Sequence, residues 1–141
     1  MLSSLNILPS FFPFLRMRAS KNESAKVMDT DEMTMYEGVW GEMHVEYDVF
    51  KTVMDITPYL KGLPNDRDPC PHWGIVVKGK MKIIYDGKEE IANTGDAYYF
   101  PPNHTGMAEA GTEVWEFSPN DKLQKTMEVI NHNMEAMMQK K

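Results

Sequence analysis

Three side chains in this chain of 141 residues are of types that bind transition metals: Cys70, His72 and His104. Cys70 and His72 are two residues apart in a proline-flanked, extended segment, so in a β-like backbone their side chains share a face. Thiolate and imidazole groups suit zinc, copper or ferrous iron, and Glu116 on a later predicted strand can add an oxygen ligand. A divalent transition metal bound by some subset of Cys70, His72 and His104 is therefore one interpretation of these residues.

The same stretch also allows interpretations without a transition metal. A buried cysteine often behaves as a small apolar side chain, and a histidine beside Trp73 can be a hydrogen-bonded wall residue. Cys70 acting as a nucleophile with His72 as its base is less favoured, because neighbours on one strand face point in parallel, with Cα atoms about 7 Å apart. Asp66 and Asp68 can hold a harder cation, although a charged loop beside prolines is usually solvated.

Aromatic residues on the predicted strands favour a pocket for a small organic molecule. Side chains alternate along a strand, so either Tyr98 or Tyr99 faces inward, but not both. Pockets of this kind are apolar and aromatic, with a few polar groups. We expect His72 and His104 to face one cavity and, with Glu116, to orient the ligand by hydrogen bonds. The predicted ligand-binding residues are His72, Trp73, Tyr98, His104 and Glu116, and no catalytic residue is assigned.

Short strands separated by glycine and proline turns must position these side chains. Strict alternation from Glu42 to Val49 predicts a strand with one face in water, which places His44 in solvent. Residues 73–78, 80–85, 88–92, 96–100 and 112–117 also have strand patterns, and Asp86-Gly87 indicates a type I′ hairpin turn. This pattern is typical of a closed or sandwiched antiparallel architecture.

Both ends of the chain differ from this pattern. Ser118 as a cap and Pro119 at the first helical position predict a C-terminal helix over residues 119–141, with an apolar stripe from Leu123 to Met137 that packs on the barrel or on a partner subunit. Residues 1–27 are apolar, then basic, and are interrupted by prolines. They are shorter than the roughly 20 apolar residues of a spanning helix. We expect them to be a disordered or non-native extension outside the fold, with residues 28–118 forming the barrel.

Two groups of residues resemble the signatures of the cupin superfamily. The second signature is a Gly, five residues of any type, a Pro, one residue, a Gly, two residues, a His, three residues and an Asn. Gly95 and Pro101 occupy the places of its first Gly and its Pro. Asn103, Gly106 and Ala110 stand where the second Gly, the metal-binding His and the Asn belong.

The first signature is a His, one residue of any type, a His, three or four residues, a Glu, six residues and a Gly. With its last Gly at Gly79, it puts His72 at the Glu position and Asp66 and Asp68 at the two His positions. The runs CPHWG at 70–74 and GDAYY at 95–99 are similar to small single-domain cupins with no assigned activity. The resemblance implies an all-β double-stranded β-helix, or jelly-roll barrel, with a C-terminal helix, a degenerate metal site and a homodimer.

Composition limits the classes of partner. The formal net charge of −6 argues against nucleic acid or an anionic membrane surface, because both require a basic face. A single cysteine forms no internal disulfide, which is compatible with a reducing cytoplasm. The resemblance to cupins implies two functions. We favour a cupin that binds or senses a small molecule, because the metal residues of the signatures are lost while their turn residues are kept; the alternative is a metal-dependent isomerase or dioxygenase that uses a nonstandard Cys/His ligand set.

Overall fold

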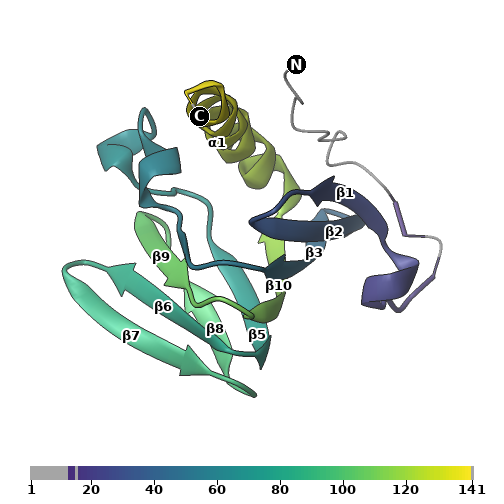
Figure 1. Cartoon of the computed structure of the whole chain (residues 1–141). Coiled ribbons are helices and arrows are strands. Elements are labelled where there is room, and N and C mark those ends of the chain that lie inside the picture. Colours follow the sequence, from purple (N-terminus) through teal and green to yellow (C-terminus); the bar gives the residue numbers. More distant parts are fainter. Residues whose placement is uncertain (1–12, 15, 141) are drawn as a thin grey trace.

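Two antiparallel sheets and one long helix make up the computed structural model, which describes residues 13–14 and 16–140 (Figure 1). The larger sheet has the strand order β1-β2-β3-β10-β5-β8, and the smaller sheet has the order β4-β9-β6-β7. The strands are β1 (Ala25–Asp29), β2 (Met33–Trp40), β3 (Met43–Phe50), β4 (Met54–Asp55), β5 (His72–Lys78), β6 (Lys80–Tyr85), β7 (Lys88–Asn93), β8 (Ala97–Phe100), β9 (His104–Ala108) and β10 (Glu113–Pro119).

The two sheets face each other as the layers of a jelly roll do, which confirms the mostly β class expected from the sequence. No strand ladder among the described residues joins one sheet to the other, so hydrogen bonds do not close the barrel. The Asp86-Gly87 hairpin lies between β6 and β7 as predicted, with both residues at positive φ. Three short 3₁₀ helices, η1 (Lys21–Glu23), η2 (Thr57–Leu60) and η3 (Pro64–Asp66), interrupt the connections.

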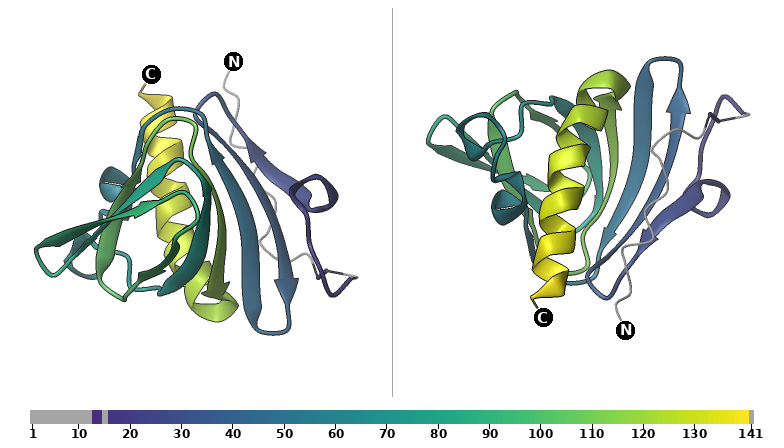
Figure 2. Two further views of the ribbon diagram at one scale, coloured as in Figure 1. Left: turned by 90° about the horizontal axis from the view of Figure 1, so that it is seen from below. Right: turned by 90° about the horizontal axis from the view of Figure 1, so that it is seen from above.

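The helix α1 (Asn120–Gln139) lies across the opening between the two sheets (Figure 2). Its predicted apolar stripe faces the protein: Leu123 and Ile130 are buried, and Met127 and Met134 are partly buried. The predicted cap is wrong, because the Ser118 hydroxyl lies 2.7 Å from Nδ1 of His72 and makes no capping bond. No helix among the described residues is long and apolar enough to cross a membrane.

The N-terminal segment contributes more to the fold than the sequence indicated. Strand β1 begins at Ala25, inside the expected extension, and Val27 is fully buried in the core. The Phe14 ring packs onto Gly38, where an added Cβ would lie only 2.1 Å from it. The described part of residues 1–27 therefore pairs with and packs on the barrel, and the remainder of that segment lies outside the described residues.

Strand β3 forms where the alternation placed it, but the predicted wet face is wrong. His44 is 1% exposed, and Glu46 and Asp48 are also buried, because this polar side of β3 points between the sheets. His44 Nε2 lies 2.5 Å from Oε2 of Glu37, its neighbour across to β2. The hydrophilic side of this strand is thus the interior of the barrel.

Candidate functional site

A row of acidic residues runs across the inner face of the larger sheet. In the register of β2, β3 and β10, Glu37 pairs with Glu46, and Glu46 pairs with Glu116. Like charges directly opposite each other destabilise a sheet. A row of this kind in the interior therefore requires protons, hydrogen-bond donors or a bound cation.

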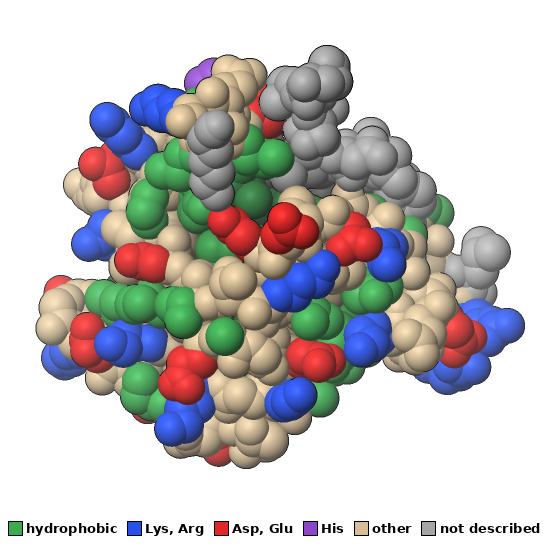
Figure 3. Space-filling view, in the orientation of Figure 1, with side chains coloured by type: hydrophobic (Ala, Val, Ile, Leu, Met, Phe, Trp, Pro, Cys, Tyr) green, Lys and Arg blue, Asp and Glu red, His purple; other side chains and the backbone are tan. Residues whose placement is uncertain are grey.

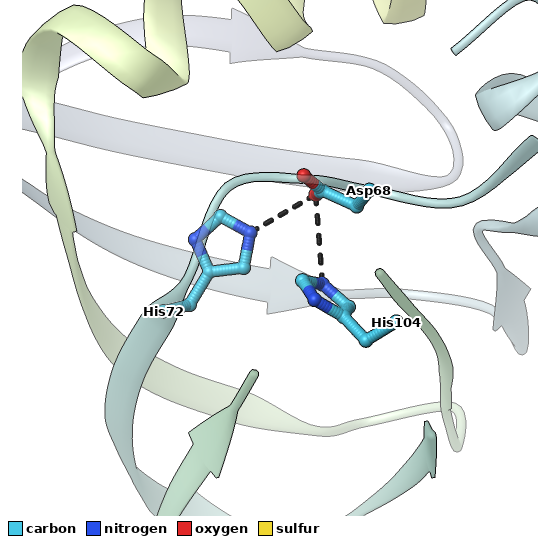
Figure 4. A group of neighbouring side chains, drawn as sticks. All are labelled: Asp68, His72 and His104. Atoms are coloured by element: carbon cyan, nitrogen blue, oxygen red, sulfur yellow. Dashed lines mark hydrogen bonds and ion pairs between the residues drawn. The ribbon is translucent and has the colours of Figure 1, made fainter. Parts of the chain in front are cut away.

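Asp68, His72 and His104 form the first of two clusters on this inner surface (Figure 4). Oδ2 of Asp68 lies 3.0 Å from Nε2 of His72 and 3.5 Å from Nε2 of His104. The two imidazole rings are 5.0 Å apart between centroids, and all three residues are buried. The two histidines thus face one cavity, as expected, and both point their Nε2 atoms at the same carboxylate oxygen.

Local backbone geometry fixes the positions of these three side chains. Asp68 lies in the proline-rich segment before β5, and its backbone amide donates to the carbonyl oxygen of His104 over 2.9 Å. His72 begins β5 and His104 begins β9. Backbone pairing between the loop and β9 therefore holds Asp68 beside His104 independently of any ligand.

The hydrogen bond of His104 to the backbone decides its tautomer. Nδ1 lies 2.7 Å from the carbonyl oxygen of Pro101, which can only accept, so Nδ1 carries the hydrogen. In the neutral ring, Nε2 then presents its lone pair to Asp68. A lone pair facing a carboxylate oxygen at 3.5 Å is unfavourable unless a proton or a metal ion lies between them.

Charges near the two histidines shift their pKa values in opposite directions. Burial by itself lowers the pKa of His72, but the charge of Glu116 and the hydrogen bond and charge of Asp68 outweigh it and raise that pKa above its ordinary value. Burial, only partly opposed by Asp68, lowers the pKa of His104. His104 is therefore the imidazole that stays unprotonated and free to bind a metal.

Glu46, Asp48 and Glu116 form the second cluster, with one oxygen from each within 4.8 Å of the others. Burial, followed by the charges of Asp48 and Glu116, raises the pKa of Glu46 well above its ordinary value. Burial, followed by the charges of Glu116 and Glu37, does the same to the pKa of Asp48. Glu46 and Asp48 therefore hold protons at pH values where exposed carboxyl groups are ionised.

Tyr98 and Gly74 orient the third carboxylate of this cluster. The Tyr98 hydroxyl donates to Oε1 of Glu116 over 2.8 Å, and Oε2 of Glu116 lies 3.8 Å from Nδ1 of His72. Gly74 sits between them in the register of β5, and a Cβ there would meet the Tyr98 hydroxyl at 2.4 Å. Glu116 thus lies between the two clusters.

One cavity of about 130 Å³ contains both clusters. Its polar wall is formed by Glu46, Asp48, Asp68, His72, His104 and Glu116. The rest is mostly apolar and includes eight methionines, among them Met28, Met33, Met35 and Met134. Methionine is flexible and polarizable, so such a wall adapts to the shape of its ligand. In the space-filling view, hydrophobic side chains gather beside α1, with acidic side chains next to them (Figure 3).

Some residues expected at the site lie elsewhere. Trp73 points outward, is 44% exposed and stacks on Tyr99, so the prediction that it lines the cavity is wrong. Tyr98 is the inward-facing tyrosine of the pair, but it acts through Glu116 and does not line the cavity itself.

Cys70 also falls outside the two clusters. Its thiol is buried and donates to the carbonyl oxygen of Pro71. Burial, with a smaller contribution from Asp68, raises the pKa of this thiol to about 12. Cys70 therefore does not join His72 and His104 in a cluster, as Asp68 does, and a neutral thiol at this position is not an activated nucleophile.

Glu46 and Asp48 are the residues that the sequence interpretation missed. Their alternation with apolar neighbours identified the strand, but it does not tell which face is wet. Here both faces of β3 are covered, so the polar residues are enclosed with the apolar ones.

The position of Gly106 explains how His104 can replace the usual cupin histidine. Both residues lie on the inner side of β9, two residues apart, and both line the cavity. A Cβ at Gly106 would meet the Lys82 carbonyl oxygen at 2.8 Å and the Phe100 ring at 2.9 Å. A ligand side chain does not fit there, and the imidazole enters from the start of the strand instead.

Comparisons with known proteins agree with this fold. A family model for the cupin domain matches residues 53–106, which include Asp68, His72 and His104. This match and the two-sheet architecture support membership of the cupin superfamily. No curated protein sequence matches the chain.

Several solved structures share the fold. An RmlC-like cupin from Shewanella frigidimarina is 14% identical, with a TM-score of 0.52 over 74% of this chain and 91% of that one. KdgF from a Halomonas species is 17% identical, with a TM-score of 0.52 over 79% and 94% of the two chains. The polyketide cyclase RemF from Streptomyces resistomycificus is 11% identical, with a TM-score of 0.53 over 75% and 80%. Similarity at these identities shows the fold alone.

Proposed function

We propose that this cupin binds a small organic molecule in its cavity, through a divalent transition metal held by Asp68, His72 and His104. The observation that carries this proposal is the convergence of two Nε2 atoms on one carboxylate oxygen, with His104 Nε2 bearing a lone pair. Nitrogen and oxygen ligands of this kind suit zinc, iron or copper. The metal would act as a Lewis acid toward an oxygen atom of the bound molecule.

The surroundings of the three ligands support a metal rather than an ordinary core. Metal-binding histidines usually donate their other ring hydrogen to a nearby acceptor, which fixes the ring. His104 does so to the Pro101 carbonyl oxygen, and His72 has the Ser118 hydroxyl 2.7 Å from its Nδ1. Both imidazoles are thus already oriented for binding through Nε2.

The metal is tested by elemental analysis and native mass spectrometry of untagged protein. We expect about one zinc, iron or copper per chain, lost in His72→Ala and His104→Ala but kept in Cys70→Ala and Trp73→Ala. Native mass spectrometry also detects a copurified organic molecule. A wild-type protein that fails to bind added zinc, iron(II) or copper contradicts the metal, as does loss of metal in Cys70→Ala.

The ligand set also favours a second candidate, a metal-dependent isomerase or dioxygenase acting on a small metabolite. Two histidines and one carboxylate with open positions are typical of non-haem iron(II) oxygenases. The test is oxygen uptake by iron(II)-loaded protein supplied with a metabolite extract, with His104→Ala as the control. Uptake that is equal in both proteins argues against a dioxygenase.

A homodimer through the outer face of β5 and β8 is a further part of the proposal. Trp73, Ile75, Val77 and Tyr99 are each more than 40% exposed on this face, and β8 is an edge strand of the larger sheet. Exposed apolar patches next to an open strand edge mark association surfaces. Light scattering should give twice the monomer mass for the wild type and the monomer mass for Trp73→Glu. A wild-type monomer at every concentration would refute it.

A further inference from the structure

The second cluster, Glu46, Asp48 and Glu116, lies on the inner side of two neighbouring strands. Glu46 and Asp48 come from β3, and Glu116 from the paired strand β10. Glu46 and Asp48 are 7% and 5% exposed, and all three line the cavity. These carboxyl groups are therefore removed from bulk water but face a space that can hold a ligand.

An unsatisfied oxygen in this cluster indicates that something is bound there. Oδ1 of Asp48 is buried and has no hydrogen-bond partner among the described residues. Buried polar atoms are almost always paired, and an unpaired one costs about 1–3 kcal/mol. Nδ1 of His44, 3.9 Å from Oε2 of Glu46, is likewise buried and unpaired. A donor in the cavity would satisfy the Asp48 oxygen.

The cavity is lined by more carboxyl groups than basic groups. Four carboxyl groups line it, from Glu46, Asp48, Asp68 and Glu116, and no lysine or arginine does. A divalent ion on Asp68, His72 and His104 balances two negative charges at most. Among the described residues, the basic groups beside the second cluster are two imidazoles: Nδ1 of His72 lies 3.8 Å from Oε2 of Glu116, and Nδ1 of His44 lies 3.9 Å from Oε2 of Glu46.

Apolar side chains lie directly beside these carboxyl groups. Asp48 pairs with Met35 across the strands, and Met35 pairs with Met28, so both methionines share a row with Asp48. The cavity of about 130 Å³ is close to the size of cavity, about 150 Å³, that binds benzene. A cavity of this size and lining fits a molecule of about six heavy atoms with a charged end and an apolar end.

We propose that Glu46, Asp48 and Glu116 bind the ammonium group of a small organic amine, whose apolar part lies against Met28, Met33 and Met35. An ammonium group has three hydrogens and no acceptor, so it can donate one to each of the three carboxyl groups. This inference rests on the proposed function only in that the cavity is the ligand site. It does not require the metal.

A hard divalent cation is the competing occupant, and the wall argues against it. Magnesium keeps several of its waters when bound, and each ordered water needs two to four polar partners. Thioether and methyl groups offer few such partners, whereas they pack well against an alkyl chain. The combination of three carboxyl groups and a methionine wall therefore fits an alkylammonium ion better than a hydrated metal ion.

Calorimetry with three probes tests the proposal: n-butylammonium chloride, n-butanol and magnesium chloride. We expect n-butylammonium to bind the wild type at least about tenfold more tightly than n-butanol, which has the same shape without the charge. Asp48→Asn should weaken n-butylammonium at least about tenfold. Glu113→Gln, on the outer side of β10, is the matched control and should leave binding unchanged.

Three outcomes would overturn the proposal. In the first, n-butanol and n-butylammonium bind equally tightly. In the second, magnesium binds and n-butylammonium does not affect its binding. In the third, folded wild-type protein shows no detectable binding of n-butylammonium.

A second pair of variants distinguishes the metal site from the amine site. His104→Ala should lose metal and still bind n-butylammonium, whereas Asp48→Asn should keep the metal. Failure of the metal site and failure of the amine site therefore give different results.

Discussion

Tyr98 reaches Glu116 across Gly74, from a strand that does not itself pair with β10. The hydroxyl group passes through the space that a side chain at residue 74 would fill. This bond holds Glu116 in place between His72 and the carboxyl groups of Glu46 and Asp48.

Tyr98→Phe removes this donor and leaves the Glu116 carboxyl group poorly satisfied in the interior. We expect a loss of about 1–3 kcal/mol in the free energy of unfolding, the usual cost of a lost hydrogen bond to a buried charged group. Urea denaturation at pH 7 measures it. Tyr99→Phe, on the exposed face of the same strand, should change stability by less than about 0.5 kcal/mol. Equal effects of the two substitutions would argue against the role given to Tyr98.

The buried pair of His44 and Glu37 gives a second prediction. His44→Ala removes the imidazole 2.5 Å from the buried Glu37 carboxyl group, and we expect a cost of up to about 3–5 kcal/mol. Adding Glu37→Gln should recover part of that loss, because an amide tolerates burial better than a carboxylate. His132→Ala, at an exposed position on α1, serves as the control. A His44→Ala protein as stable as the control would restore the solvent-exposed interpretation.

Stability should fall as pH rises, because Glu46 and Asp48 have raised pKa values. Below about pH 4 both groups are protonated in the folded and the unfolded states, and they cost nothing. Above that pH the unfolded chain releases these protons while the folded protein retains them. The free energy of unfolding therefore decreases as pH rises, until the pH passes the folded-state pKa values of Glu46 and Asp48.

Asp48→Asn removes one of these groups and should therefore stabilise the protein increasingly as pH rises. In ligand-free protein we expect a gain in Tm of at least about 2 °C at pH 8, the change that about 1 kcal/mol produces in a domain of this size. The gain should disappear near pH 4. A difference that stays constant from pH 4 to pH 8 would contradict the raised pKa of Asp48.

Cys70 should be unreactive in the folded protein. Its pKa of about 12 leaves on the order of 1,000-fold less thiolate than a free cysteine at neutral pH, and the side chain is 1% exposed. Reaction with an aromatic disulfide reagent at pH 8 should be complete in guanidinium chloride and nearly absent in buffer. Rapid labelling of the native protein would revive the nucleophile interpretation.

Ser118 should act on the metal rather than on the helix. Ser118→Ala removes the hydroxyl beside Nδ1 of His72, and we expect metal affinity to fall by about 10–100-fold, as is usual when the partner of a metal-binding histidine is lost. Helix content by circular dichroism should be unchanged, because Ser118 makes no capping bond. Loss of helix with unchanged metal affinity would favour the capping role.

The sequence alone determined the local elements of this protein. Asp86-Gly87 defined a hairpin, because positive φ at two consecutive positions suits few other residues, and both adopt it. Alternation located β3, and the spacing of Leu123, Ile130 and Met134 gave the packed side of α1. Each of these signals depends on residues close together in the chain. The resemblance to cupins added the jelly-roll class. Its signatures also consist of residues close together in the chain, because they mark turns.

Only the tertiary structure decided which sides of the strands meet and which residues make the site. Asp68, and not Cys70, lies beside His72 and His104, because the loop containing Asp68 pairs with His104 at the start of β9. These two residues are 36 positions apart in the chain, so the spacing of nearby residues does not predict their contact. His44, Glu46 and Asp48 alternate in the same way whether their side faces water or the cavity. That choice depends on the second sheet and on α1, which cover the polar side of β3 with apolar side chains from distant parts of the chain.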